Sequence, residues 1–147
     1  MCRSVYSVGC NLGGKLGHGF GANTHHAQLI TQFQNINLQP IAVAAGVWHA
    51  AVLGKDGRIC TWGCGKYGCL GHGNEEAQSV PMVVGALRDI KAIHVATGEY
   101  TTFVVADGGD VYSFGCNELS NLGYSNSDTD VQVGEIFLAS KLYGPSI

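Results

Sequence analysis

The chain has 147 residues and a formal net charge of −3, and only 13% of its residues are charged, against about 25% in ordinary soluble domains. Its few Lys and Arg residues are scattered, which argues against a nucleic-acid binder that relies on phosphate contacts. No uninterrupted apolar stretch approaches the ~18 residues of a membrane span, and the first residues lack the apolar segment of a signal peptide. We therefore expect an intracellular protein of the cytoplasm, the nucleus or both, without nucleic acid or membrane as a direct partner.

Glycine is abundant, with 22 residues, whereas only 3 prolines occur, a composition typical of short strands joined by tight turns. The first strand is predicted within residues 5–11, and a long polar connector follows over residues 23–39. Residues 41–44 are predicted as a further, more buried strand. A hairpin comes next, because two β-prone runs, residues 50–53 and 58–62, flank a turn that ends in Asp-Gly.

A second polar connector, residues 74–79, leads into residues 80–84. We predict these as a short outer strand, because the residue before a proline favours an extended conformation. Residues 92–96 resemble the earlier buried strand. A second hairpin is predicted from residues 102–106 and 110–114, around an Asp-Gly-Gly turn.

The sequence repeats itself with a period of slightly more than 50 residues. Gly9, Gly63 and Gly115 each end a β-prone run, and a Leu-Gly pair follows seven residues later in every copy. A second landmark, Gly46, recurs as Gly98 at the same spacing. A unit of ~50 residues with about four short strands has the size of a propeller blade, which buries its faces only against neighbouring blades.

The best-developed copy reads Ala-Gly46-x-x-His49, then an Asp-Gly turn, then Trp62-Gly63, then Leu70-Gly71-His-Gly. This pattern resembles the repeat of the regulator of chromosome condensation (RCC1) family, over about residues 5–124. The resemblance implies an all-β fold, a partial β-propeller of about two and a half blades with four short antiparallel strands each. The landmarks, expected to be structural, are Gly46, His49, Trp62, Gly63, Leu70, Gly71, His72, Gly98, Gly115, Leu122 and Gly123.

The resemblance also implies how the chain is organised. A single partial domain over residues 1–147 would hold repeats at about 1–40, with an incomplete start, 41–92, and 93–147, with a fading end. The family propeller is a closed ring of seven blades, so we expect a plant-like member shortened from a longer propeller. An excised piece of a longer protein, or several copies that assemble into a ring, are the alternatives.

The cysteines invite comparison with a zinc site, because Cys60, Cys64 and Cys69 lie close to His72 in the sequence. Their spacing is looser than the paired C-x2-C of zinc knuckles. The repeat itself explains one recurring position, which holds Cys10, Cys64 and Cys116. We therefore expect reduced structural thiols and no metal.

Residues 63–68 match G-x-G-x-x-G and follow a predicted strand. A dinucleotide site also requires a helix that opens at this point, and the glycines that follow disfavour one. We therefore expect no cofactor.

His18 and His72 share one place in Leu-Gly-His-Gly, where the third copy has Tyr124. We expect a structural ring that covers the turn and bonds backbone. His49 has Thr101 as its counterpart, and no serine, cysteine or carboxylate can be paired with it from the sequence, so catalysis is not expected. The large aromatic residues also recur at the blade period and are predicted to lie in the core or between blades: Trp48 with Tyr100, and Trp62 with Phe114.

Three functional hypotheses follow. The first is a non-enzymatic protein-interaction module that binds an unknown protein through its rim loops, with residues 23–39 and 74–79 as candidates. The second is guanine-nucleotide exchange on a Ran-like small GTPase, which the family's founding member performs through a β-wedge inserted in one blade. Neither predicted hairpin, at residues 54–57 or 107–109, holds such an insertion. The third is a remnant without independent function, whose missing blades a longer product or self-association would supply.

Overall fold

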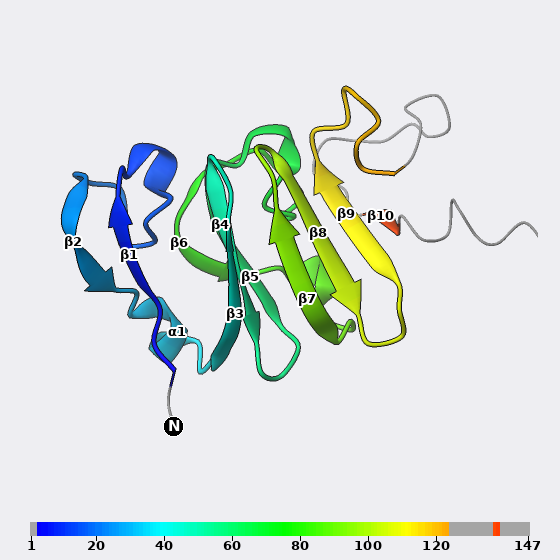
Figure 1. The fold of residues 1–147 in the computed structure, drawn as a ribbon, viewed down its shortest axis with the longest axis horizontal. Coiled ribbons are helices and arrows are strands. Elements are labelled where there is room, and N and C mark those ends of the chain that lie inside the picture. The colour runs from blue at the N-terminus through cyan, green and yellow to red at the C-terminus, as the bar shows by residue number, and fades with distance from the viewer. Residues whose placement is uncertain (1–2, 124–136, 139–147) are drawn as a thin grey trace, which may run out of the picture.

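Three antiparallel sheets lie side by side in the computed structural model, which describes residues 3–123 and 137–138 (Figure 1). We number the sheets as blades 1 to 3 in chain order. Blade 1 pairs β1 (Tyr6–Gly9) with β2 (Thr24–Leu29). The strands of blade 2 are β3 (Pro40–Ala45), β4 (His49–Gly54), β5 (Ile59–Gly63) and β6 (Gln78–Val83). Those of blade 3 are β7 (Ala92–Thr97), β8 (Thr101–Ala106), β9 (Val111–Gly115) and β10 (Phe137–Leu138).

Short helical turns connect these strands. They are the 3-10 turns η1 (Leu12–Gly14), η2 (Lys66–Gly68) and η3 (Gly85–Leu87), and the single-turn helix α1 (Gln32–Asn35). Among the described residues, no helix has the length and apolar character needed to cross a membrane. The predicted all-β fold of partial propeller blades is confirmed.

Both predicted hairpins are present. In blade 2, β4 and β5 pair from His49 opposite Gly63 to Leu53 opposite Ile59. The turn between them places Gly57 at φ +85°, a conformation that glycine adopts without steric cost. The hairpin of β8 and β9 repeats this arrangement, and the predicted outer strand is β6, at the edge of blade 2.

The prediction that residues 23–39 form a polar loop is wrong, because this segment contains β2 and α1. Strand β2 pairs with β1, so cross-strand hydrogen bonds hold residues that have no alternating apolar pattern of their own. His25 and His26 lie exposed in this strand. The position of β2 beside β1 matches that of β6 beside β5.

The two strands predicted to be more buried are instead largely exposed. Strands β3 and β7 form correctly, but each lies at one edge of its sheet, and Ile41, Val43 and Ile93 are 42%, 60% and 54% exposed. Apolar composition alone does not distinguish an edge strand from a central one. The buried strands are the two central ones of blade 2, β4 and β5, in which every residue is enclosed.

Strand β4 is buried because neighbouring blades cover both of its faces. Successive side chains of a strand point to opposite faces. Ala50 and Val52 pack with Trp62 and Phe33 on the side of blade 1, while Ala51 and Leu53 pack on the side of blade 3. The second cluster also contains Ile59, Val84, Leu87, Ala92, Val95, Val104 and Phe114. Each fully buried Val or Leu side chain contributes about 1.5–3 kcal/mol, so stacking of the blades provides most of the core.

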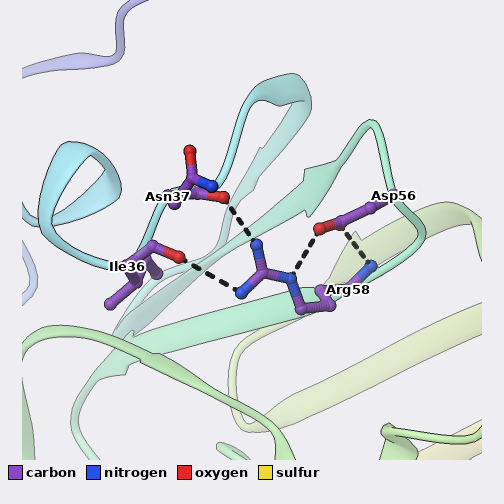
Figure 2. Close-up of polar contacts among 4 residues, drawn as sticks. All are labelled: Ile36, Asn37, Asp56 and Arg58. Atoms are coloured by element: carbon purple, nitrogen blue, oxygen red, sulfur yellow. Dashed lines mark hydrogen bonds and ion pairs between the residues drawn. The ribbon is translucent and has the colours of Figure 1, made fainter.

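Figure 2 shows how Arg58 ties the α1 connector to the turn between β4 and β5. Its guanidinium donates to the carbonyl oxygens of Ile36, at 3.3 Å, and Asn37, at 2.7 Å. It also pairs with the Asp56 carboxylate at 2.7 Å. Partial burial acts to raise the pKa of Asp56, but hydrogen bonds and charge from Arg58 outweigh it and leave the pKa lowered.

Candidate functional site

The landmark glycines lie where backbone segments approach one another closely, either between blades or within one blade. A Cβ atom on Gly46, in the turn between β3 and β4, would overlap the carbonyl oxygen of Gly98 in the matching turn of blade 3. Gly63 and Gly115 end β5 and β9 at φ +112° and +118°, and a Cβ on either would overlap a backbone carbonyl of the turn beside it. At each of these places the backbones approach too closely for a larger residue.

A large ring of each later blade packs against a glycine of the blade before it. The Trp62 ring lies against Gly17, and the Phe114 ring lies against Gly71. Both glycines have positive φ, at +79° and +76°. Trp62 Nε1 also donates to the Lys15 carbonyl oxygen at 2.9 Å. The two ring–glycine pairs therefore form equivalent joints between successive blades.

The same hydrogen bond recurs in all three copies: a strand hydroxyl donates to the carbonyl of the leucine nine residues later. The pairs are Ser7 with Leu16, Thr61 with Leu70, and Ser113 with Leu122, at 2.6, 2.7 and 2.8 Å. The three leucines are buried, so this bond fixes the loop that follows the landmark glycine.

His18 and His72 contact these hydroxyls through Nε2, at 2.8 Å from Ser7 Oγ and 3.0 Å from Thr61 Oγ1. Because each hydroxyl hydrogen points to a carbonyl, the imidazole N–H must be the donor. This Nε2 partner is thus a side-chain hydroxyl, where the sequence suggested backbone. Burial lowers the pKa of His72, and backbone of Thr61 partly opposes the shift. Tyr124, the third copy's counterpart, lies outside the described residues.

His49 joins blade 2 to blade 3. Its Nε2 lies 2.8 Å from Thr102 Oγ1, and that hydroxyl donates to the Cys69 carbonyl at 2.7 Å, so the His49 N–H is the donor to Thr102. The side chain is 1% exposed. Burial lowers its pKa to about 4, although the backbone of Glu99 and Thr101 opposes part of this shift. His49 is therefore neutral at physiological pH.

The cysteines do not converge with the histidines. Cys60 and Cys69 are buried, and burial raises the pKa of each thiol to about 12, which makes them unreactive at neutral pH. The Cys69 thiol donates to the Cys64 carbonyl at 3.1 Å. Within the part of the chain that the structure describes, no three His, Cys, Asp or Glu side chains are placed to share a metal ion.

A helix does not open at residues 63–68, where the sequence matches G-x-G-x-x-G. The segment forms only the three-residue turn η2, and Tyr67 inside it has φ +59°, which interrupts any helix. A left-handed conformation is unusual for a bulky residue and costs about 1–2 kcal/mol. The first copy has Gly13 at the same position, at φ +73°.

Tyr67 belongs to a row of aromatic side chains where turns of blades 2 and 3 meet. We call Trp48, Tyr67 and Tyr100 the aromatic rim. The Trp48 and Tyr100 rings stack with centroids 6.1 Å apart, and Tyr67 meets Tyr100 edge-on at 5.2 Å. The turns that carry them lie along the upper edge of Figure 1. Trp48 and Tyr100, predicted to lie in the core or between blades, thus bridge two blades at the surface.

The aromatic rim is partly open to solvent. Tyr67 is 38% exposed, and Leu119, its counterpart in the third copy, is 88% exposed. Lys15 of blade 1 holds its ammonium 5.5 Å from the centroid of the Trp48 ring and donates to the Val47 carbonyl at 3.2 Å. The rim therefore spans blades 2 and 3, and a cation from blade 1 contacts it at one end.

Carboxylates lie along the aromatic rim, and Glu99 accepts a hydrogen bond from Trp48 Nε1 at 3.5 Å, at the end where Lys15 lies. Glu75 accepts a hydrogen bond from the Tyr67 backbone N–H at 2.7 Å, which holds the unusual turn. The pKa of Tyr67 is raised, and the largest cause is the charge of Glu118. Smaller contributions come, in decreasing order, from Cys116, burial, Glu75 and Glu99. Glu75 comes from the connector over residues 74–79, so that candidate loop reaches the rim. We did not predict from the sequence that the three rings of the rim come together. One indication was present in the sequence, because the second copy has Tyr67 at the position where the first copy has Gly13.

A family model described as "Regulator of chromosome condensation (RCC1) repeat" matches residues 56–105, and a second RCC1 repeat model matches residues 92–120. The human E3 ubiquitin-protein ligase HERC2 is 37% identical over 128 residues, which is 84% of this chain and 3% of that protein. The mouse Inhibitor of Bruton tyrosine kinase is 33% identical over 143 residues, 97% of this chain and 11% of that protein.

Solved structures show the same arrangement of blades. The crystal structure of human WBSCR16 matches with a TM-score of 0.79 and 27% identity, over 92% of this chain and 34% of that one. Prp20p from Saccharomyces cerevisiae matches with a TM-score of 0.73 and 21% identity, over 91% of this chain and 33% of that one. The chain therefore spans about a third of these structures and a small part of the curated relatives.

Proposed function

Because the chain is built from repeats of the regulator of chromosome condensation (RCC1) family, we propose that it is a non-enzymatic protein-interaction module that binds its partner at the aromatic rim. The observation that carries the proposal is the row of Trp48, Tyr67 and Tyr100 across two blades. Tyr and Trp are enriched at the energetic centres of protein interfaces, because they offer large contact areas with few rotatable bonds.

The scaffold beneath the rim favours binding over chemistry. Neighbouring blades fix the turns that carry Trp48 and Tyr100, so the rings are held in place before a partner arrives. His49, whose pKa is strongly lowered, is enclosed between blades and bonds Thr102. A general base must reach its substrate, and an enclosed imidazole does not.

The activities named for the relatives do not change this proposal. HERC2 is named as a ligase, but the similarity involves 3% of that protein. The Prp20p structure was reported with its binding to Gsp1p and histones, and at 21% identity the likeness extends to the fold. Guanine-nucleotide exchange by an inserted wedge finds no support in the described hairpins, whose turns are residues 55–58 and 107–110.

The proposal can be tested by comparative capture followed by reconstitution. The full chain and its Tyr67→Gly variant are immobilised, and proteins from a cell extract that bind only the native chain are identified and purified. We expect at least one to bind the native chain saturably in isothermal titration calorimetry, with affinity reduced at least about tenfold by the substitution, or about 1.4 kcal/mol. Purified partners that bind both chains equally would refute the rim as the binding surface.

A further inference from the structure

We infer that the aromatic rim binds an arginine or lysine side chain of the partner, seated on Tyr67 and Tyr100 and surrounded by Glu75, Glu99 and Glu118. This inference rests on the proposed binding function and names the chemistry of the partner, a basic peptide segment. Three features of the described residues support it: the ring faces, the charges around them and the construction of the turn.

The rings offer faces of the kind that attract cations. A cation within about 6 Å of an aromatic centroid is attracted by the negative face of the ring. The rim already holds one such cation, because Lys15 Nζ lies 5.5 Å from the Trp48 centroid. Tyr67 stands edge-on to Tyr100, with an interplanar angle of 72°, so the two rings form a corner rather than a closed stack.

Most of the charges that act on Tyr67 are those of carboxylates. Neither the ion pair of Arg58 with Asp56 nor that of Arg88 with Asp89 involves the rim. Glu75, Glu99 and Glu118 all act on the Tyr67 phenol electrostatically, and all three are exposed. Lys66 also lies in the turn and is exposed, and Lys15 lies at the Trp48 ring, so the three carboxylates outnumber the two lysines.

The turn presents Tyr67 at a cost to the fold. Position 67 needs φ +59°, a value for which glycine is better suited, and the first copy indeed has Gly13 there. The Glu75 carboxylate holds this turn through the Tyr67 N–H while it supplies charge beside the ring. Strain kept at an exposed aromatic residue agrees with a binding role for that ring.

A cationic side chain fits this corner because aromatic faces and negative charges occur there together. An apolar partner would gain from the rings but would desolvate the carboxylates. An acidic segment or a nucleic acid would be repelled by Glu75, Glu99 and Glu118. Only a cation gains from both the ring faces and the surrounding charge.

The test is a titration of the ¹⁵N-labelled full chain with a heptapeptide of alternating glycine and arginine, monitored by nuclear magnetic resonance. The matched control peptide carries citrulline, the neutral isostere, at every arginine. Saturable shifts are expected for the Trp48 indole and the Tyr100 amide with the arginine peptide only. The indole of Trp62, which is 2% exposed, provides an internal control that should not move.

Two variants test the two halves of the corner separately. Tyr67→Gly removes the ring at a position where glycine fits the backbone, and affinity for the arginine peptide should fall about tenfold. The triple variant Glu75→Gln, Glu99→Gln and Glu118→Gln removes the charges but keeps an acceptor for the Tyr67 N–H, and it should lower both the affinity and its salt dependence. Glu76→Gln, which removes a neighbouring exposed carboxylate, is the control and should bind like the native chain.

Equal shifts with the citrulline peptide, or unchanged affinity in both the Tyr67 and the triple variants, would overturn the inference. If Glu76→Gln lowered the affinity for the arginine peptide as much as the triple variant does, the inference would also fail, because the effect would then come from the overall charge of the chain. If a captured partner needs Tyr67 while the arginine peptide does not bind, the interaction function stands and only its cationic chemistry falls. If the peptide binds but no partner uses the rim, the proposed function fails instead.

Discussion

The stability of the fold should decrease between neutral pH and about pH 5 because His49 is buried as a neutral imidazole. Its pKa is about 4 in the folded chain and 6.5 as its ordinary value, so an unfolded chain takes up a proton that the folded chain refuses. The contribution is fully present above pH 6.5 and is lost as the pH falls from there toward 4. The unfolded state binds more protons in this window, so acid favours unfolding.

The magnitude follows from the two pKa values. Each unit of difference corresponds to about 1.36 kcal/mol, so the 2.5 units between about 4 and 6.5 amount to roughly 3 kcal/mol when protonation is complete. At pH 5, where the folded imidazole is still mostly neutral, the loss is about 2 kcal/mol. Asp56, whose pKa is lowered, loses its contribution to stability only below its ordinary pKa of 3.8.

The assay is urea denaturation of the full chain at about pH 7.5 and about pH 5, compared with the same pair of measurements on His49→Thr. Threonine is the residue that the third copy carries at this position, as Thr101. The variant loses the bond to Thr102 and is less stable at both pH values, so only the pH-dependent difference is compared. His72, whose pKa is also lowered, remains in both proteins and cancels.

The native chain should lose about 2 kcal/mol more than His49→Thr between the two conditions. Equal losses in the two proteins would refute the reasoning, because another group would then carry the acid sensitivity. A direct measurement of the His49 titration by nuclear magnetic resonance should give a midpoint near pH 4. A midpoint close to 6.5 would contradict the burial argument at its source.

Three further substitutions test the joints of the fold. Gly71→Ala should lower the free energy of unfolding, measured by urea denaturation, by about 2 kcal/mol or more, because a Cβ there would lie 2.8 Å from the Phe114 ring. Gly73→Ala is the control, since Gly73 has a similar φ but open space around it, and it should lose only about 1 kcal/mol. Equal losses in the two variants would refute the close packing of Phe114 against Gly71. Arg58→Lys should destabilise by about 1 kcal/mol and speed hydrogen exchange around Asn37, because lysine cannot reach both carbonyls; unchanged exchange would contradict Figure 2. Tyr67→Gly should unfold close to the native midpoint, because relief of about 1–2 kcal/mol of strain offsets the lost ring contact; a large loss would show that the ring serves the core.

The elements that the sequence predicted well are those specified by local chemistry. The hairpin of β4 and β5 combines β-prone runs with an Asp-Gly turn, and Gly57 takes the positive φ that this turn requires. The repeat period gave the number and order of the strands in blade 2, because equivalent landmarks must occupy equivalent places in stacked blades.

The errors arose where distant segments decide the outcome. Strand β2 contains His25 and His26 and has no apolar face of its own, so only its pairing with β1 makes it a strand. Ile41 and Val43 suggested burial, but they lie on an edge strand, where one-dimensional composition gives no information about coverage. The aromatic rim joins residues 48, 67 and 100, which become neighbours only after the blades stack.

Comparison of the copies separates the positions that hold the fold from those that are available for binding. Where backbones pack closely, the copies agree: Gly46 and Gly98 face each other across two blades, and Gly63 and Gly115, each against a turn of its own blade, have the same φ within a few degrees. At the turn after the landmark glycine the copies differ, with Gly13, Tyr67 and Leu119 at one equivalent position, and of these Tyr67 and Leu119 are exposed whereas Gly13 lies against Cys64 of the next blade.

A position that packs against another blade must satisfy the same geometry in each repeat, whereas a position that faces solvent is free to take a side chain suited to a partner. The repeat landmarks are therefore poor guides to function, even though they identify the fold. We therefore expect the specific role of this chain to depend on residues by which one blade differs from the next, and Tyr67 is the position where that difference also strains the backbone.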